Sequence, residues 1–245
     1  MTDQIAIVTG ASSGRGAGGA RELAAAGAKV AVVARRRERL DELAAEIGGV
    51  AVECDLADAA QVDRVVPAVV EQLGAPSILV NAAGTIEAVV PAEEEALDAI
   101  ERTLAINLVA PLRLSQAVFP HLRDHGGGAI VHVSSISGLV GIPGIPQAAY
   151  AASKAGLSGL TTELAVQWAR HSIRVNTVAP GFFRSEITAD MYDGERGLEW
   201  LRRNTPLPVD GTVDDVVGAV LWLVSRAGRY VTGQTIVVDG GWTAR

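Results

Sequence analysis

A tyrosine and a lysine four residues apart, Tyr150 and Lys154, are the strongest candidates for chemistry in this chain. A phenol with an ordinary pKa of about 10 is a poor proton donor or acceptor at neutral pH. On a helix, residues four apart share one face, so the Lys154 ammonium can lie beside the phenol and lower its pKa. The pair predicts a proton-transfer site, although Tyr-x-x-x-Lys alone is ordinary helix composition.

A glycine-rich stretch, TGASSGRG at residues 9–16, could hold a phosphate group. Glycines at a strand-to-helix turn let the backbone approach a pyrophosphate closely, and the helix N-terminus offers free N–H groups and the positive end of its dipole. A glycine-rich turn alone is weak evidence, but this one follows a predicted strand and opens a helix. We therefore predict a dinucleotide site at Gly10, Gly14 and Gly16.

Short β-branched runs alternate with Ala- and Leu-rich helical segments along the 245 residues. Strands are predicted at residues 5–9, 30–34, 51–54, 78–81, 129–134, 174–179 and 235–239, and the main helices at 18–26, 36–47, 60–73, 96–121, 149–170 and 213–224. This alternation predicts a single α/β domain over residues 1–245, with a Rossmann-type, doubly wound fold and a seven-stranded parallel sheet covered by helices on both faces. Residues 182–208 interrupt the alternation and are predicted to form a substrate lid.

Charge and composition exclude several classes of function. The net charge is −7, with basic residues scattered rather than grouped, which argues against nucleic acid as a partner. No apolar stretch reaches the length of a membrane span and no leader pattern precedes the first strand, so we expect a cytoplasmic protein. Cys54, the only cysteine, rules out an internal disulfide and is expected to be buried and inert, and the four histidines show no metal-ligand spacing.

Further short motifs follow the glycine-rich stretch in a fixed order: NAAG at 81–84, AINL at 105–108, SS at 134–135, YAASK at 150–154, VAPGFF at 178–183 and GQTIVVDGGW at 233–242. Over nearly its whole length the chain resembles the classical short-chain dehydrogenase/reductase family. The resemblance implies that the tyrosine is the acid–base residue, that the lysine binds the nicotinamide ribose and lowers the phenol pKa, that a serine orients the carbonyl, and that an asparagine supports a water-linked proton path. These roles fall on the catalytic candidates Tyr150, Lys154, Ser135 and Asn107.

Two of these assignments have support from the residues themselves. Asn107 lies inside the predicted helix 96–121, where Asn is mildly unfavourable, which is consistent with a break or a water site. The serine could also be Ser137, which the spacing usual in the family selects. We favour Ser135 because it follows the strand end, the rigid part, and an insertion around residues 145–147 would be absorbed by the loop.

The residues after the second predicted strand favour NADP(H) over NAD(H). A carboxylate there would bind the ribose hydroxyls and repel a 2′-phosphate, whereas Arg35 and Arg36 can bind that phosphate in a bidentate manner. Arg37 is expected to face solvent. Arg15 stands where the family usually has an isoleucine, and it is expected either to reach the pyrophosphate or an acidic neighbour, or to face solvent. With the positions that the resemblance implies, the predicted cofactor site comprises Gly10, Ser12, Ser13, Gly14, Arg15, Gly16, Arg35, Arg36, Asp55, Leu56, Asn81, Ala82, Ala83, Gly84, Tyr150, Lys154, Pro180, Gly181, Phe183 and Ser185.

The substrate pocket is predicted to have apolar walls, because residues 138–149 carry no charge and the predicted lid is rich in aromatic residues. The predicted pocket residues are Ser137, Ile145, Phe182, Met191, Tyr192 and Trp200. We expect neutral, moderately hydrophobic ketones or aldehydes, or the matching alcohols, as substrates. A 3-oxoacyl-(acyl-carrier-protein) reductase is the second candidate, weakened by a thin basic docking surface, and a non-catalytic NADP-binding sensor or scaffold is the third. The resemblance also implies a homodimer or homotetramer.

Overall fold

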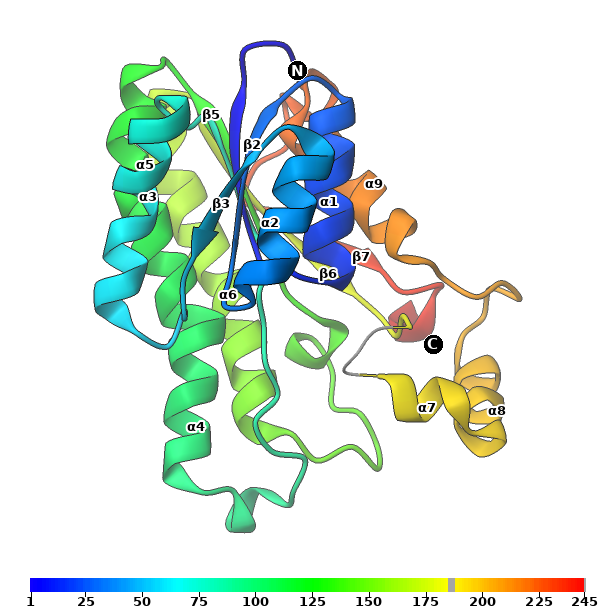
Figure 1. The fold of residues 1–245 in the computed structure, drawn as a ribbon. Coiled ribbons are helices and arrows are strands. Elements are labelled where there is room, and N and C mark those ends of the chain that lie inside the picture. Colours follow the sequence, from blue (N-terminus) through cyan, green and yellow to red (C-terminus); the bar gives the residue numbers. More distant parts are fainter. Residues whose placement is uncertain (185–187, 245) are drawn as a thin grey trace.

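A seven-stranded parallel sheet forms the centre of the computed structural model, which describes residues 1–184 and 188–244 (Figure 1). The strands are β1 (Ile5–Thr9), β2 (Lys29–Ala34), β3 (Val50–Glu53), β4 (Ile78–Asn81), β5 (Gly128–Val133), β6 (Ile173–Pro180) and β7 (Thr235–Val238). Their order is β3-β2-β1-β4-β5-β6-β7, and every adjoining pair is parallel. The predicted doubly wound, Rossmann-type fold is confirmed. The order changes direction between β1 and β4, which is where such sheets bind ligands.

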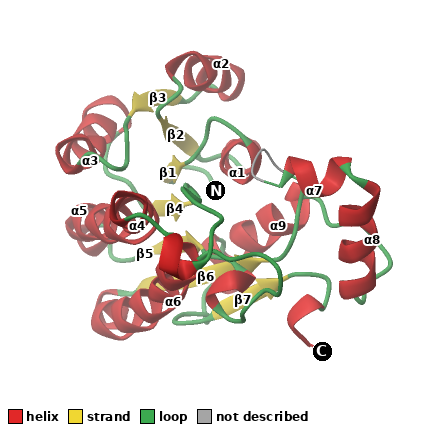
Figure 2. Cartoon of the chain, turned by 90° about the horizontal axis from the view of Figure 1, so that it is seen from below, coloured by secondary structure: helices red, strands yellow, loops and turns green. Residues whose placement is uncertain are grey.

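Helices cover both faces of the sheet (Figure 2). One face carries α1 (Gly14–Ala25), α2 (Arg37–Ile47) and α9 (Val213–Val224), and the other carries α3 (Ala59–Leu73), α5 (Ala110–Asp124) and α6 (Ala148–Trp168). Two hydrophobic clusters result, one on each side of the sheet. Within β1, Ala6 and Val8 belong to the first cluster and Ile5 and Ile7 to the second, because successive strand side chains point to opposite faces.

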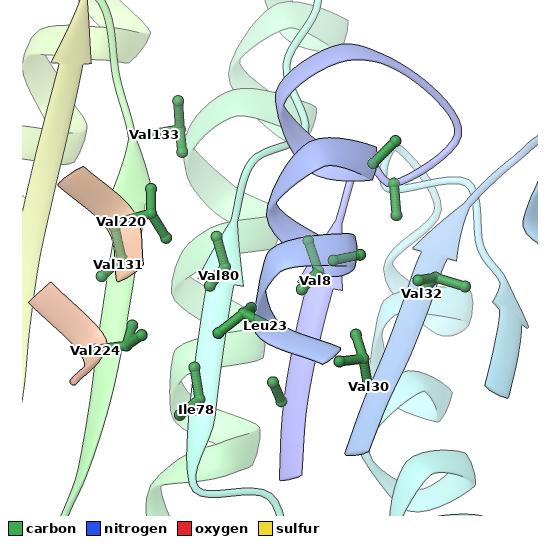
Figure 3. Close-up of a cluster of buried hydrophobic side chains, with 14 of the residues drawn as sticks. Val8, Leu23, Val30, Val32, Ile78, Val80, Val131, Val133, Val220 and Val224 are labelled. Carbon is green, nitrogen blue, oxygen red and sulfur yellow. The ribbon is translucent and has the colours of Figure 1, made fainter. Parts of the chain in front are cut away.

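Figure 3 shows the first cluster at the centre of the sheet. Val8, Val32 and Val80 stand on three neighbouring strands and are almost fully buried. Leu23 of α1 and Val220 of α9 pack on the same layer of strand side chains. This packing fixes the start of α1 against the carboxyl ends of the strands, where the glycine-rich stretch lies.

The long helix predicted at 96–121 is interrupted at the expected place. It consists of α4 (Leu97–Leu104), a π-helical turn (Ala105–Val109) and α5. A π turn holds one residue more than an α turn and is often found at functional sites. Asn107 lies in the middle of this turn and is fully buried.

The segment predicted as a lid lies outside both helix layers (Figure 2). It contains α7 (Ala189–Asp193) and α8 (Glu195–Asn204), two short helices that the sequence analysis did not predict. An Arg184–Asp193 ion pair of 2.6 Å joins the start of the segment to the end of α7. After α8 the chain returns to the C-terminal part, where the Leu207 N–H donates to the Gly240 carbonyl at 3.0 Å.

Candidate active site

A cavity of about 370 Å³ opens at the carboxyl ends of β1 to β5. Its walls come from the glycine-rich stretch, the ends of β2 and β3, the NAAG motif, the end of β5 and the start of α6. Most of the predicted cofactor residues line it. The predicted residues that do not are Asn81, Pro180, Gly181 and Phe183, and Ser185 lies outside the described residues.

The glycine-rich stretch forms a tight cradle at one end of this cavity. Gly10 has a φ of +70°, and a Cβ there would lie 2.7 Å from the Ala83 Cα atom. A Cβ on Gly16 would lie 2.3 Å from the Gly10 carbonyl oxygen. The side chain of Ser13, the N-cap residue, does not cap the first turn of α1, so the N–H groups of that turn are available to an anion. The cradle therefore fits a diphosphate group.

Two arginines follow β2 at the rim of the same cavity. Arg36 donates from Nε to the Ser12 hydroxyl at 2.9 Å and from Nη2 to the Ser13 hydroxyl at 2.7 Å. Arg35 is exposed and also lines the cavity. Both guanidinium groups thus lie where β2 ends, with Ala34 in place of a carboxylate. Arg37, expected to face solvent, is exposed and pairs with Asp41 at 2.8 Å.

Tyr150 and Lys154 lie on the first turns of α6 at the other end of the cavity. The buried Lys154 Nζ donates to the Val133 carbonyl at 3.0 Å and lies 5.6 Å from the centre of the Tyr150 ring. Burial, and secondly the charge of Arg15, lower the pKa of Lys154 to about 7. Burial raises the pKa of Tyr150, whereas its contact with Ser135 and the charge of Arg15 act in the opposite direction.

The serines after β5 have separate partners. Ser134 donates to the Lys154 carbonyl at 2.7 Å. Ser135 contacts the Tyr150 phenol and donates to the Ser137 hydroxyl at 3.3 Å. Ser137 also accepts from the Gln147 side chain at 3.0 Å. Ser135 is therefore beside the phenol, and Ser137 is one hydrogen bond further away.

Asn107 connects three segments beside the tyrosine. Its Oδ1 accepts from the Thr85 N–H at 2.9 Å, and its Nδ2 donates to the Thr85 carbonyl at 2.9 Å and to the Ser153 hydroxyl at 3.1 Å. Ser153 in turn donates to the Tyr150 carbonyl at 2.7 Å. The sequence analysis missed Thr85 and Ser153. For Ser153 the three-residue spacing from Tyr150 was an available signal, since serines on helices often bond to the preceding turn.

Asn81 and His132 form a buried pair behind the cavity. The Asn81 Nδ2 donates to the His132 Nδ1 at 3.1 Å, across β4 and β5. Burial, and secondly the charge of Lys154, lower the pKa of His132 to about 3, so the imidazole is neutral. Asn81 thus bonds within the sheet instead of lining the cavity. Cys54 does line the cavity, and burial raises the pKa of its thiol to about 11.

The predicted substrate-pocket residues do not come together at Tyr150. Phe182 and Tyr192 line a second cavity of about 450 Å³, whose other walls come from α8 and residues 205–211. Ser137, Ile145, Met191 and Trp200 line neither of these two cavities, although Trp200 packs edge-on against Phe182 at 5.4 Å. Phe183 is buried in the hydrophobic core. Ile86 and Ile106, which the sequence analysis missed, line the first cavity.

Two findings limit other kinds of site. No group of three or more His, Cys, Asp or Glu residues in the described ranges could hold a metal ion. Among the same residues, no helix is both long enough and apolar enough to cross a membrane.

Residues 10–243 match the protein family described as enoyl-(acyl carrier protein) reductase. The chain is 37% identical over 250 residues to D-threitol dehydrogenase of Mycolicibacterium smegmatis, an alignment that covers 100% of this chain and 95% of that protein. Among solved structures, a gluconate 5-dehydrogenase from Burkholderia cenocepacia in complex with NADP and tartrate is 32% identical, with a TM-score of 0.93 and coverage of 100% of this chain and 97% of that one. A 4-hydroxyisoleucine dehydrogenase complexed with NADH is 30% identical, with a TM-score of 0.93 and coverage of 99% and 100%.

Proposed function

Since the chain belongs to the classical short-chain dehydrogenase/reductase family and is an oxidoreductase of the alcohol dehydrogenase type, we propose that it interconverts an alcohol and the matching ketone or aldehyde with NADP(H). The observation that carries this proposal is that Tyr150 and Lys154 line one end of a cavity whose other end is a diphosphate cradle, and that Ser135 contacts the Tyr150 phenol. A bound nicotinamide supplies or accepts the hydride. The rest of the reaction is the transfer of a proton.

Tyr150 is the proposed proton donor and acceptor. In carbonyl reduction its hydroxyl donates to the substrate oxygen, and in alcohol oxidation its phenolate accepts the hydroxyl proton. Lys154 is held by the Val133 carbonyl close to the phenol, and its ammonium favours the phenolate. With a pKa of about 7, Lys154 is increasingly neutral above that pH.

Ser135 is the proposed partner of the substrate oxygen, because it is the serine in contact with the phenol. A hydroxyl there can donate a second hydrogen bond to the oxygen on which charge develops. Asn107 is proposed to support a water-linked proton path from the tyrosine. Its bonds to Thr85 and to Ser153 also fix the backbone that carries Tyr150.

Arg35 and Arg36 are proposed to bind the 2′-phosphate of NADP(H). Supporting this choice, the residues directly after β2 are arginines instead of a carboxylate, and the Arg36 guanidinium is already held over the cradle by two serines. Asp55 and Leu56 are proposed to contact the adenine end, with residues 81–84 beside its ribose. Pro180, Gly181, Phe183 and Ser185 remain predicted contacts of the nicotinamide end.

Neutral, moderately hydrophobic alcohols and carbonyl compounds are the proposed substrates. Ile86 and Ile106 in the wall of the first cavity and the uncharged residues 138–149 support an apolar pocket. The threitol-oxidising relative adds small neutral polyols to the substrates that should be tried. Residues 182–208 are proposed as the substrate lid of the single domain, and a dimer or tetramer in the cytoplasm as the working form.

The test is a spectrophotometric screen of NADPH and NADH against neutral ketones of increasing size, the ketoses of small polyols, anionic keto acids and a 3-oxoacyl thioester. We expect the highest kcat/KM with NADPH and a neutral substrate. Preference for the thioester would support the carrier-linked alternative. Cofactor binding without turnover of any class would support a sensor or scaffold instead.

A matched pair of variants tests the cofactor choice. Arg36→Ser should reduce kcat/KM for NADPH about tenfold more than for NADH, because a charged hydrogen bond to phosphate is lost. Arg37→Ser removes a neighbouring exposed guanidinium that pairs with Asp41, and should leave that ratio unchanged. An NADH preference that is insensitive to Arg36 would overturn the NADP(H) assignment.

A further inference from the structure

Arg15 is the charged side chain of the glycine-rich stretch. It is the second residue of α1 and is only partly exposed. It lines the same cavity as Tyr150 and Lys154, and its charge acts on both of them. Arg15 therefore shares this cavity with the proton-transfer pair, and its positive charge favours the phenolate of Tyr150.

Among the described residues, no carboxylate pairs with this guanidinium, in contrast with several other arginines. Arg21 pairs with Glu46 at 2.7 Å and Arg113 contacts Asp63 at 2.5 Å, both near the surface. Enclosing a cation without a counter-ion costs free energy, and burial lowers the pKa of Arg15 accordingly. Tyr150 is the group whose negative form offsets this effect.

We propose that Arg15 is a second cationic partner of the Tyr150 hydroxyl, which stabilises the phenolate together with Lys154 and so sets the pH at which the tyrosine can accept a proton. The proposal rests on the proposed function, because it assumes that Tyr150 transfers the proton. Arg15 acts through Tyr150 and is a positioning residue in this sense.

A second cation beside Tyr150 matters because Lys154 does not keep its charge at alkaline pH. Lys154 has a pKa of about 7, so its ammonium is lost as the pH rises above neutrality, while an arginine stays charged. Arg15 thus keeps a positive charge near the phenol under the alkaline conditions that favour alcohol oxidation. Arg15 also lowers the pKa of Lys154, so its removal leaves Lys154 more protonated and part of the effect is offset.

Other ionisable groups near Tyr150 come from three further elements. On α6 itself Lys154 faces the phenol, and on β5 the neutral His132 lies behind Lys154. Glu95, from the segment before α4, accepts the Ala149 N–H at 3.1 Å at the start of α6. None of these is a second cation at alkaline pH, which leaves that role to Arg15.

The direct test is a titration of the Tyr150 phenol in the full-length, cofactor-free protein. With tyrosine labelled by carbon-13 at Cζ, Tyr150→Phe assigns the Tyr150 signal by its disappearance. The midpoint of this titration should move to higher pH in Arg15→Ile and in Arg15→Met, and should stay close to the parent value in Arg15→Lys, which keeps the charge. An unchanged midpoint in the folded Ile and Met variants would overturn the proposal.

The pH profile of alcohol oxidation gives the second readout. Arg15→Ile should move the rise of kcat/KM to higher pH and lower its value at pH 8 about fivefold, and Arg15→Lys should restore most of the loss. A raised KM for the cofactor with an unchanged pH profile would instead assign Arg15 to the diphosphate and overturn the proposal. Because the titration needs no turnover, it separates failure of this inference from failure of the proposed function, which would show as an active Tyr150→Phe protein.

Discussion

The cavity at the strand ends and the cavity beside α8 differ in how their walls are assembled. The first takes residues from the ends of five parallel strands and from the starts of α1 and α6, which are far apart in the sequence. The second is lined by Phe182 and by residues of α7, α8 and the segment 205–211, which are close together in the sequence. A site built from many buried elements holds its groups precisely, while a site built from one external segment can change without disturbing the sheet. In this molecule the proton-transfer groups have the first kind of support, and the proposed lid has the second.

The largest expected effect tests whether the first cavity is the site of chemistry. Tyr150→Phe should lower kcat about a thousandfold, because it removes the group that exchanges the proton. Turnover measured at saturating substrate checks this, with cofactor binding and thermal unfolding as controls for the fold. Undiminished reduction of the carbonyl would refute the proposed mechanism.

A pair of glycine variants tests how tightly the cradle is built. Gly16→Ala should lower the free energy of unfolding by about 3 kcal/mol, because its Cβ would lie 2.3 Å from the Gly10 carbonyl oxygen. Gly19→Ala on the same helix meets nothing within 4 Å and should raise it by up to about 1 kcal/mol. Urea unfolding measures both free energies. Equal losses of stability in the two variants would mean that a Cβ is tolerated at Gly16 as well as at Gly19.

Variants of Ser135 and Ser137 test which of these two neighbouring serines acts beside the Tyr150 phenol. Ser135→Ala should lower kcat about a hundredfold, since a hydrogen bond to the reacting oxygen is lost. Ser137→Ala should lower kcat only a few-fold, because Ser137 is hydrogen-bonded to Ser135 and Ser135 is the serine that contacts the phenol. Steady-state kinetics ranks them, and the reverse order would transfer the role to Ser137.

The buried His132 makes the stability of the strand-end region depend on pH. The pKa of His132 is about 3 in the folded protein and 6.5 for an unperturbed histidine. Between these two pH values the unfolded chain binds a proton at His132 and the folded chain does not. Its contribution to stability is present above pH 6.5 and is lost as the pH falls toward 3, at about 1.4 kcal/mol per pH unit. His132→Asn keeps an acceptor for Asn81. Between pH 7.5 and pH 5 its free energy of unfolding should fall by about 2 kcal/mol less than that of the parent protein. Parallel urea curves at both pH values measure this, and identical losses would contradict it.

The smallest expected effect tests the second cavity. Tyr192→Ala should raise KM for the substrate about fivefold with little change in kcat, because Tyr192 lines the second cavity and Tyr150 lines the first. Tyr230→Ala removes a fully exposed tyrosine and serves as the matched control. A large fall in kcat for Tyr192→Ala would mean that the two cavities act as one site.

The contrast between the two cavities also explains which parts of the fold and the site could be predicted from the sequence. The strands and the Tyr150–Lys154 pair follow from local patterns, since strands and helix faces place side chains by their spacing. The resemblance implies a serine, and its place at the strand end selects Ser135. Thr85, Ile86 and Ile106 could not be found in this way, because they reach the cavity through contacts between segments distant in the chain. The positions of Phe182, Met191 and Trp200 depend on the path of an external segment that spacing does not determine. The direction of the Arg15 side chain likewise depends on the space left by its neighbours.

Because of the π turn at Ala105–Val109, the number of residues in this helix matters for the site as well as their identity. A π turn is closed by i→i+5 bonds instead of i→i+4 bonds and so takes up one extra residue, and deleting one residue here would return the turn to α geometry and remove the bulge that carries Asn107. Asn107 would then lose the geometry of its two hydrogen bonds to the Thr85 backbone, even though no other residue had been changed. At these positions a single-codon deletion is expected to be more damaging than most substitutions, and a redesigned helix would have to keep the extra residue.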